Sequence, residues 1–183
     1  MKINAVISIL ASFLLVAFNL SLNKSTLAKH QPSSPHRTAE LIVNDKKISV
    51  EYGSPSIRGR KIIGDLVPYN NVWIMGANRA TTLKTETDLM IGGMLIPKGQ
   101  HTLFSLPTEI GWTLIINKQA TRSCAPYSSD DEKLEIGRAN LALTHIENPV
   151  EQLTISLINN NASVTMRLEW ENTQVSVNFT VRR

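Results

Sequence analysis

The chain has 183 residues, of which 42% are hydrophobic, and a formal net charge of +4. This length predicts one domain with enough mass to bury a core. The only cysteine, Cys124, excludes a disulfide within the chain, and the small net charge gives no support to nucleic acid binding.

The first residues are typical of an export signal. Lys2 gives a positive start, residues 3–22 are almost wholly apolar, and Thr26 and Ala28 place small residues where a signal peptidase cuts. We therefore predict a signal peptide over residues 1–28, cleaved after Ala28, and a secreted or periplasmic protein. The alternative is an uncleaved leader that anchors the chain to a membrane, because its apolar run approaches the ~20 residues that a span needs.

Residues 29–38 are polar, contain two prolines and offer nothing to bury, which predicts a flexible tether. The domain is then expected over residues 39–183. The four histidines show no spacing typical of metal ligands; they are His30, His36, His101 and His145. We therefore expect neither a metal nor a cofactor.

The first part of the domain alternates apolar and polar residues with period two. This alternation over Ile48–Tyr52 predicts a strand, and Asn44–Asp45 predicts a tight turn from an earlier one. Residues 81–91 alternate cleanly and predict one strand, followed by a hairpin turn at Gly92–Gly93. The return strand is expected to break at Pro97–Gly99, where proline favours an edge position or a bulge.

The second part continues the pattern around one long interruption. Trp112–Ile116 predicts a short strand, and residues 117–133 form the longest polar interval. Intervals this long are usually functional or disordered, and the residues leave both open. Beyond it we predict a strand with a bulge at Gly137, a hairpin around Asn159–Asn161 and a turn at Glu171–Asn172.

About nine or ten short strands without a convincing helical window predict an all-β fold, an antiparallel β-sandwich or flattened barrel. Between two of the strands lies a stretch that we call the central block, residues 52–82. It holds four glycines, two prolines and four basic side chains. Because these residues gather in one loop and not in the strands, the central block is the expected working surface.

Short motifs in and around the central block are distinctive: Val50–Pro55, Arg58–Ile62, Leu66–Tyr69, Val72–Trp73, Gly76–Asn78, Ala80–Thr82, Pro97–Gly99, Leu103–Pro107 and Trp112. Together they resemble the bacterial secreted family catalogued as domain of unknown function 2911, over residues 39–181. The resemblance implies an all-β secreted or envelope protein. It implies no activity, since none is established for the family.

The chain departs from the family pattern at three positions. Ile74 replaces the usual Arg after the Trp, Arg79 replaces an acidic residue after Gly-Ala-Asn, and His101 replaces a Tyr. The first two changes fit together, because losing the Arg would leave the acidic residue without a partner and Arg79 removes that carboxylate. A site that depends on this acid is therefore not expected here.

The densest basic patch consists of Arg58, Arg60 and Lys61. Gly59 between the two arginines would let backbone and side-chain donors converge on an anion. The alternative is a loop whose basic residues face water or pair with Asp65.

A second group of candidates combines hydrogen-bonding and aromatic residues. Asn78, Arg79 and Thr81 offer polar groups for a ligand, Tyr69 offers a flat face, and Tyr127 in the long polar interval adds another. The structural alternative is that Asn78 bonds its own backbone in a turn.

These residues favour a non-catalytic binding or interaction module for a small polar or anionic ligand or an envelope protein. One alternative is a hydrolase-like envelope enzyme that uses His101 or His145 with a serine, Ser105 or Ser123, and an acid. No nucleophile motif accompanies these residues. The other alternative is a purely structural protein in which the central block turns a corner between sheets.

Overall fold

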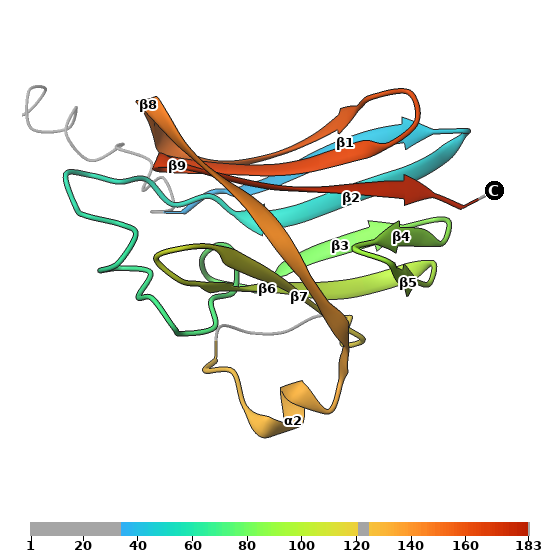
Figure 1. Ribbon diagram of the computed structural model, residues 1–183, viewed down its shortest axis with the longest axis horizontal. Coiled ribbons are helices and arrows are strands. Elements are labelled where there is room, and N and C mark those ends of the chain that lie inside the picture. The colour runs from blue at the N-terminus through green and yellow to red at the C-terminus, as the bar shows by residue number, and fades with distance from the viewer. Residues whose placement is uncertain (1–33, 121–124, 183) are drawn as a thin grey trace, which may run out of the picture. The chain divides into compact units, whose positions relative to one another are not determined.

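A computed structural model describes residues 34–120 and 125–182. Within these ranges the chain forms nine strands and one short helix (Figure 1). The elements are β1 (His36–Val43), β2 (Lys46–Gly53), β3 (Thr81–Thr85), β4 (Leu89–Ile91), β5 (Met94–Ile96), β6 (Gly99–Pro107), β7 (Trp112–Asn117), α2 (Ser129–Glu132), β8 (Glu135–Asn159) and β9 (Val164–Val181).

Several predictions concern residues outside the described ranges. These are the predicted signal peptide of residues 1–28, the first part of the predicted tether, residues 29–33, and the predictions that concern Ser123 and Cys124. In the described ranges, no helix has the length and apolar character needed to cross a membrane.

All neighbouring strands are antiparallel, in the order β1-β2-β3-β6-β7-β8-β9-β4-β5. The first part of β8 pairs with β7 and its last part pairs with β9, and the strand crosses diagonally between them in Figure 1. The sheet folds back on itself, because the Tyr52 hydroxyl of β2 accepts the Ile155 N–H of β8 at 3.0 Å although three strands separate them in the order. This arrangement confirms the predicted all-β antiparallel fold.

The local signals for strands and turns worked because they depend only on neighbouring residues. Both central residues have positive φ in two of the predicted turns, 51° and 58° at Asn44 and Asp45, and 57° and 82° at Gly92 and Gly93. The bulge predicted at Gly137 is confirmed, since the register between β7 and β8 shifts there.

Three expected boundaries differ in the structure. Residues 81–91 are two strands and not one, because β3 pairs with β2 and β6 whereas β4 pairs with β5 and β9. The turn expected at Glu171–Asn172 is wrong: β9 runs through it, and Glu171 takes a positive φ of 55° within the strand. β1 begins at His36, inside the segment expected to be a tether. Alternation does not specify the partner strand, which tertiary packing decides.

The central block supplies side chains to two separate cores. Ile62, Val67 and Met75 are at most 1% exposed in the main core. A smaller core on β6 and β7 contains Phe104 and Ile115, and the central block covers it with residues such as Ile74. The block is therefore a packed part of the fold, as well as a connection.

Backbone contacts fix the central block at both ends. At its start, Leu153 donates to the Pro55 carbonyl at 2.9 Å and Ile57 donates to the Glu151 carbonyl at 2.8 Å. Near its end, Trp73 and Ser105 exchange two backbone hydrogen bonds of 2.8 Å.

Glu171 holds the middle of the central block. Its two carboxylate oxygens accept the backbone N–H groups of Ile62 and Ile63, each at 3.2 Å. These donors lie in a turn outside the strands, and the carboxylate satisfies their N–H groups.

The tightest approach is between the end of β2 and the central block. A Cβ added at Gly53 would lie 2.0 Å from the carbonyl oxygen of Ala77, a separation that atoms do not tolerate. Only glycine allows the two backbones to come this close.

We predict that Gly53→Ala lowers the free energy of unfolding by about 3 kcal/mol or more, or prevents folding, because a backbone and not a flexible side chain must move. Gly111→Ala is the matched control, since its added Cβ meets nothing within 4 Å. This control is expected to change stability by less than about 0.5 kcal/mol. Urea denaturation of both variants measures the difference, and equal effects would contradict the prediction.

Candidate functional site

Two clefts flank the loop Gly76–Arg79 of the central block. The larger, which we call the polar cleft, has a volume of about 800 Å³ and is lined by Glu51 and Lys84 among others. The smaller, the tryptophan cleft, has a volume of about 540 Å³ and is lined by Trp73 and Trp170 among others. Ser34, Ala77 and Asn78 line both clefts.

The loop between the clefts is held by one backbone hydrogen bond within it and one side-chain hydrogen bond to Ser34. Asn78 has a positive φ of 70°, and the N–H of Arg79 donates to the Ala77 carbonyl at 2.8 Å. The Asn78 amide donates to the Ser34 carbonyl at 3.2 Å. Asn78 is thus exposed at the ridge between the two clefts.

Thr81, a predicted ligand residue, points inward. Its side chain is fully buried and its hydroxyl donates to the Met75 carbonyl at 2.9 Å. Because Met75 has a positive φ of 54°, this hydrogen bond supports a strained turn. The contacts of Thr81 are those of a structural residue.

The polar cleft takes its walls from four neighbouring strands and from the loop Gly76–Arg79. Glu51 of β2 forms an ion pair with Lys84 of β3, and Lys84 faces Gln100 of β6 in the sheet register. Arg79 and His36 complete the lining from the loop and from β1. The cleft therefore offers one carboxylate and several donors on a rigid scaffold.

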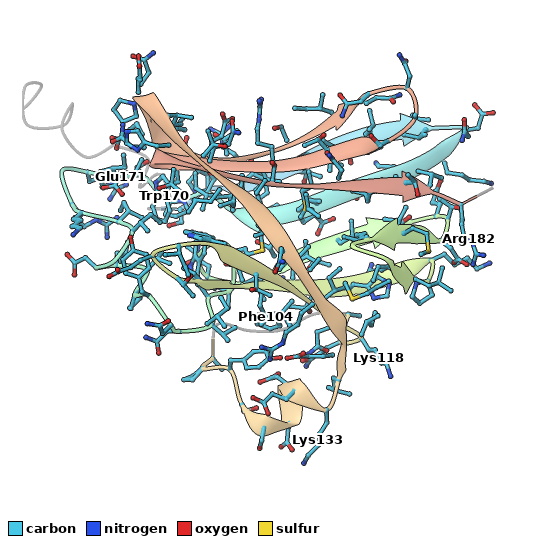
Figure 2. All side chains as sticks on the ribbon, in the orientation of Figure 1. Phe104, Lys118, Lys133, Trp170, Glu171 and Arg182 are labelled. Carbon is cyan, nitrogen blue, oxygen red and sulfur yellow. The ribbon has the colours of Figure 1, made fainter. Side chains whose placement is uncertain are left out.

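The three tryptophans of the chain contact one another, and two of them, Trp73 and Trp170, line the tryptophan cleft; Trp170 is labelled in Figure 2. Trp73 stacks on Trp170 with ring centroids 6.0 Å apart and meets Trp112 edge-on at 6.2 Å. The indole N–H of Trp73 donates to the Gly76 carbonyl at 3.2 Å. This bond links the aromatic cluster to the loop between the clefts.

The basic patch does not converge on one point. Arg58 and Gly59 both have positive φ, and they form a tight turn closed by the Arg60 N–H and the Ile57 carbonyl at 3.1 Å. The Arg60 guanidinium folds back and donates to the carbonyls of Ile57 at 3.0 Å and Ser56 at 2.7 Å. Arg58 and Arg60 line the tryptophan cleft, whereas Lys61 is exposed and lines neither cleft.

Tyr69 and Tyr127, the two aromatic candidates, also line neither cleft. The Tyr69 ring lies 2.8 Å from where a Cβ on Gly64 would be, so it packs within its own loop. The Tyr127 ring meets Phe104 edge-on at 5.0 Å, and its hydroxyl donates to Glu135. Tyr127 therefore fastens the α2 segment to the small core.

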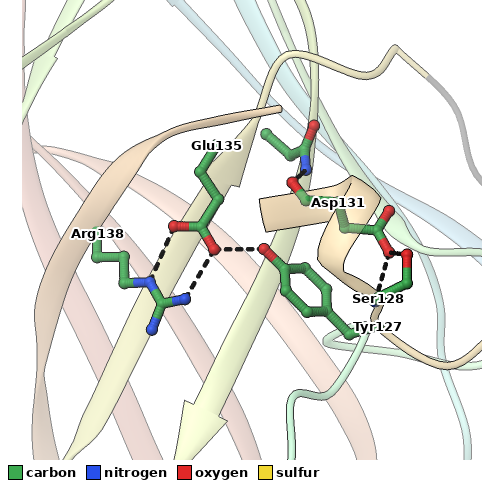
Figure 3. Close-up of polar contacts among 6 residues, drawn as sticks. Tyr127, Ser128, Asp131, Glu135 and Arg138 are labelled. Carbon is green, nitrogen blue, oxygen red and sulfur yellow. Dashed lines mark hydrogen bonds and ion pairs between the residues drawn. The ribbon is translucent and has the colours of Figure 1, made fainter. Parts of the chain in front are cut away.

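Figure 3 shows how Arg138 completes this contact. Its guanidinium donates twice to Glu135, at 2.9 and 2.8 Å, and lowers the pKa of that carboxyl below 4.5. Burial, with the hydrogen bond to Glu135, raises the pKa of Tyr127 well above its usual value of 10.0. Asp131 caps α2 by accepting the Ser128 hydroxyl and N–H, each at 2.7 Å.

Of the residues proposed for hydrolysis, His101 and Ser105 do not meet, and Ser123 lies outside the described ranges. His101 is buried, and its Nε2–H donates to the Pro97 carbonyl at 2.7 Å. Ser105 lies four residues along the same strand, so their backbones are about 13 Å apart. His145 is exposed on β8. The described ranges also contain no group of three His, Cys, Asp or Glu residues that could hold a metal.

Several cleft residues escaped the sequence analysis. Glu51, Lys84, Gln100, Leu66 and Trp170 line the clefts but were not among the ligand-binding residues predicted from the sequence. The alternation does place Glu51 and Lys84 away from the core, which is the one usable signal. The strand order that brings β2, β3 and β6 together is not encoded in that pattern.

We predict that Tyr127→Phe alters the alkaline stability of the protein. The raised pKa means that the Tyr127 contribution to stability is complete below pH 10.0 and declines as pH rises, because the unfolded phenol ionises first. At neutral pH the variant is expected to be about 1 kcal/mol less stable, and this gap should shrink above pH 10.0. Urea denaturation across this pH range measures the gap. A difference in stability between the two proteins that does not change with pH would contradict the raised pKa of Tyr127.

Residues 34–179 match a family described as "Protein of unknown function (DUF2911)". Neither a curated protein nor a solved structure gives a match. The match covers β1 to most of β9, including both clefts and the central block. The chain therefore belongs to this family of unknown function.

Proposed function

We propose that the chain is an exported, non-catalytic binding module that takes a small polar ligand in the polar cleft. One observation carries the proposal: a hollow of about 800 Å³ whose polar groups come from four adjacent strands and one fixed loop. Small-molecule sites have volumes of this size and a few well-placed polar groups. Export is supported only by the composition of residues 1–28.

The lining suits a ligand that both donates and accepts hydrogen bonds. The Glu51 carboxylate is an acceptor, and Lys84, Arg79 and the Gln100 amide supply donors. Two cationic groups against one carboxylate give a net positive charge, which favours a carboxylate or another anionic group on the ligand.

Arg79 is the residue best placed to contact a ligand. It is exposed, lines the polar cleft and makes no side-chain hydrogen bond or ion pair within residues 34–120 and 125–182. Lys84 is already paired with Glu51, so its ammonium is held in position for a second contact. A ligand carboxylate between Arg79 and Lys84 would gain charge-assisted hydrogen bonds.

The separation of His101 from Ser105 argues against a hydrolytic site built on these two residues, since neither side chain can reach the other along one extended strand.

We predict that a screen of amino acids, dicarboxylates, saccharides and phosphate by thermal shift finds a ligand that raises the melting temperature. In isothermal titration calorimetry, Arg79→Ala should lower the affinity for that ligand by about tenfold or more, because a hydrogen bond between charged groups is lost. Lys61→Ala is the matched control, as this exposed lysine lines neither cleft. Gln100→Ala should lower the affinity less than Arg79→Ala does, because the hydrogen bond that it removes is neutral.

Equal affinities for Arg79→Ala and the unchanged chain would place the ligand elsewhere and refute the polar cleft as its site. A flat screen would favour the structural alternative, in which the central block serves only to close the fold.

A further inference from the structure

We propose a second binding site, the tryptophan cleft, that takes a small aromatic carboxylate. This inference does not depend on the polar cleft. The carrying observation is an apolar hollow of about 540 Å³ with a stacked tryptophan pair in its wall and two arginines but no acidic residue in its lining.

The wall of the cleft fits a flat apolar body. Trp73 is only half-buried although it stacks on Trp170, which leaves part of its indole at the cleft. Leu66 lines the same cleft and is 47% exposed, so part of its apolar surface is open to a ligand. An aromatic ring lying between them would cover apolar surface on both and gain ring–ring contact.

The charge of the cleft selects an anion. Arg58 and Arg60 are its only ionisable lining residues. Both side chains are exposed. A cationic rim attracts a carboxylate and repels a cation, whereas a neutral ligand gains nothing from it. The polar cleft differs, since Glu51 contributes a negative charge there.

Arg60 is held in position before any ligand arrives. Its guanidinium donates through Nε to Ile57 and through one terminal nitrogen to Ser56. A guanidinium carries five N–H donors in a rigid plane, so donors remain for a carboxylate. Fixing the side chain beforehand lowers the entropy that binding would otherwise cost.

The size of the site sets the ligand class. A volume of about 540 Å³ accommodates a one- or two-ring molecule, and the single basic edge matches one acidic group. Simple anions would leave the apolar wall uncovered, and neutral aromatics would leave Arg60 without a new partner. An aromatic ring bearing one carboxylate satisfies both parts of the lining.

The experiment uses the full chain with three probes: 2-naphthoate, its neutral analogue 2-naphthamide, and acetate. Calorimetry gives the affinities, and the indole N–H signals of the three tryptophans report the location by NMR. We expect 2-naphthoate to bind and to shift the signals of Trp73 and Trp170. The amide should bind about tenfold more weakly or worse, and acetate should not shift the indole signals.

Variants separate this site from the polar cleft. Leu66→Glu adds a negative charge at the rim without changing the Arg58–Gly59 turn. We expect it to lower the affinity for 2-naphthoate by about tenfold or more. Arg60→Gln should also lower the affinity for 2-naphthoate. Because the Arg60 guanidinium supports the turn as well, the melting temperature of this variant is measured alongside. Arg79→Gln, in the polar cleft, should leave 2-naphthoate affinity unchanged.

The proposal is overturned if 2-naphthoate does not bind, if the amide binds equally well, or if Leu66→Glu has no effect. It is also overturned if Arg79→Gln abolishes binding, which would place the probe in the polar cleft. Because Arg79 and Leu66 line different clefts, failure of either proposal leaves the other standing.

Discussion

The close approach of Gly53 to Ala77 is the contact on which the rest of the molecule depends. It seals the end of β2 against the loop Gly76–Arg79, and that loop is the wall between the two clefts. Gly76 adds to the constraint, since its own Cβ would lie 3.0 Å from the Gly53 carbonyl. The clefts therefore exist because two glycines let two backbones pack without side chains between them.

The central block is longer than the topology requires. β2 and β3 are antiparallel neighbours, which a two-residue turn can join, yet the chain inserts residues 54–80 between them. The insertion places Ile62 in the main core and Ile74 in the small core, while Glu171 holds its turn by two backbone hydrogen bonds. The same segment thus stabilises the fold and forms the clefts, so substitutions in it affect both properties.

The sequence located the region of the clefts but not their membership. The clefts are lined by four of the predicted residues: Asn78, Arg79, Arg58 and Arg60. Their surface position follows from the sequence, because connecting segments rich in glycine and polar residues run over the protein surface. Thr81 and Tyr127 instead have structural contacts, with Met75 and with Phe104. A hydroxyl or a ring looks the same in a sequence whether it meets a ligand or a neighbouring carbonyl.

Local physics by itself determined the β class, the turns at Asn44–Asp45 and Gly92–Gly93, and the bulge at Gly137, because alternation and positive φ are properties of adjacent residues. Tertiary structure alone decided that β3 and β4 have different neighbours and that β9 continues through Glu171. It also brought Glu51, Lys84 and Gln100 to one cleft and Trp73 onto Trp170. These pairings join residues far apart along the chain, and strand order, which sets them, has no local signature.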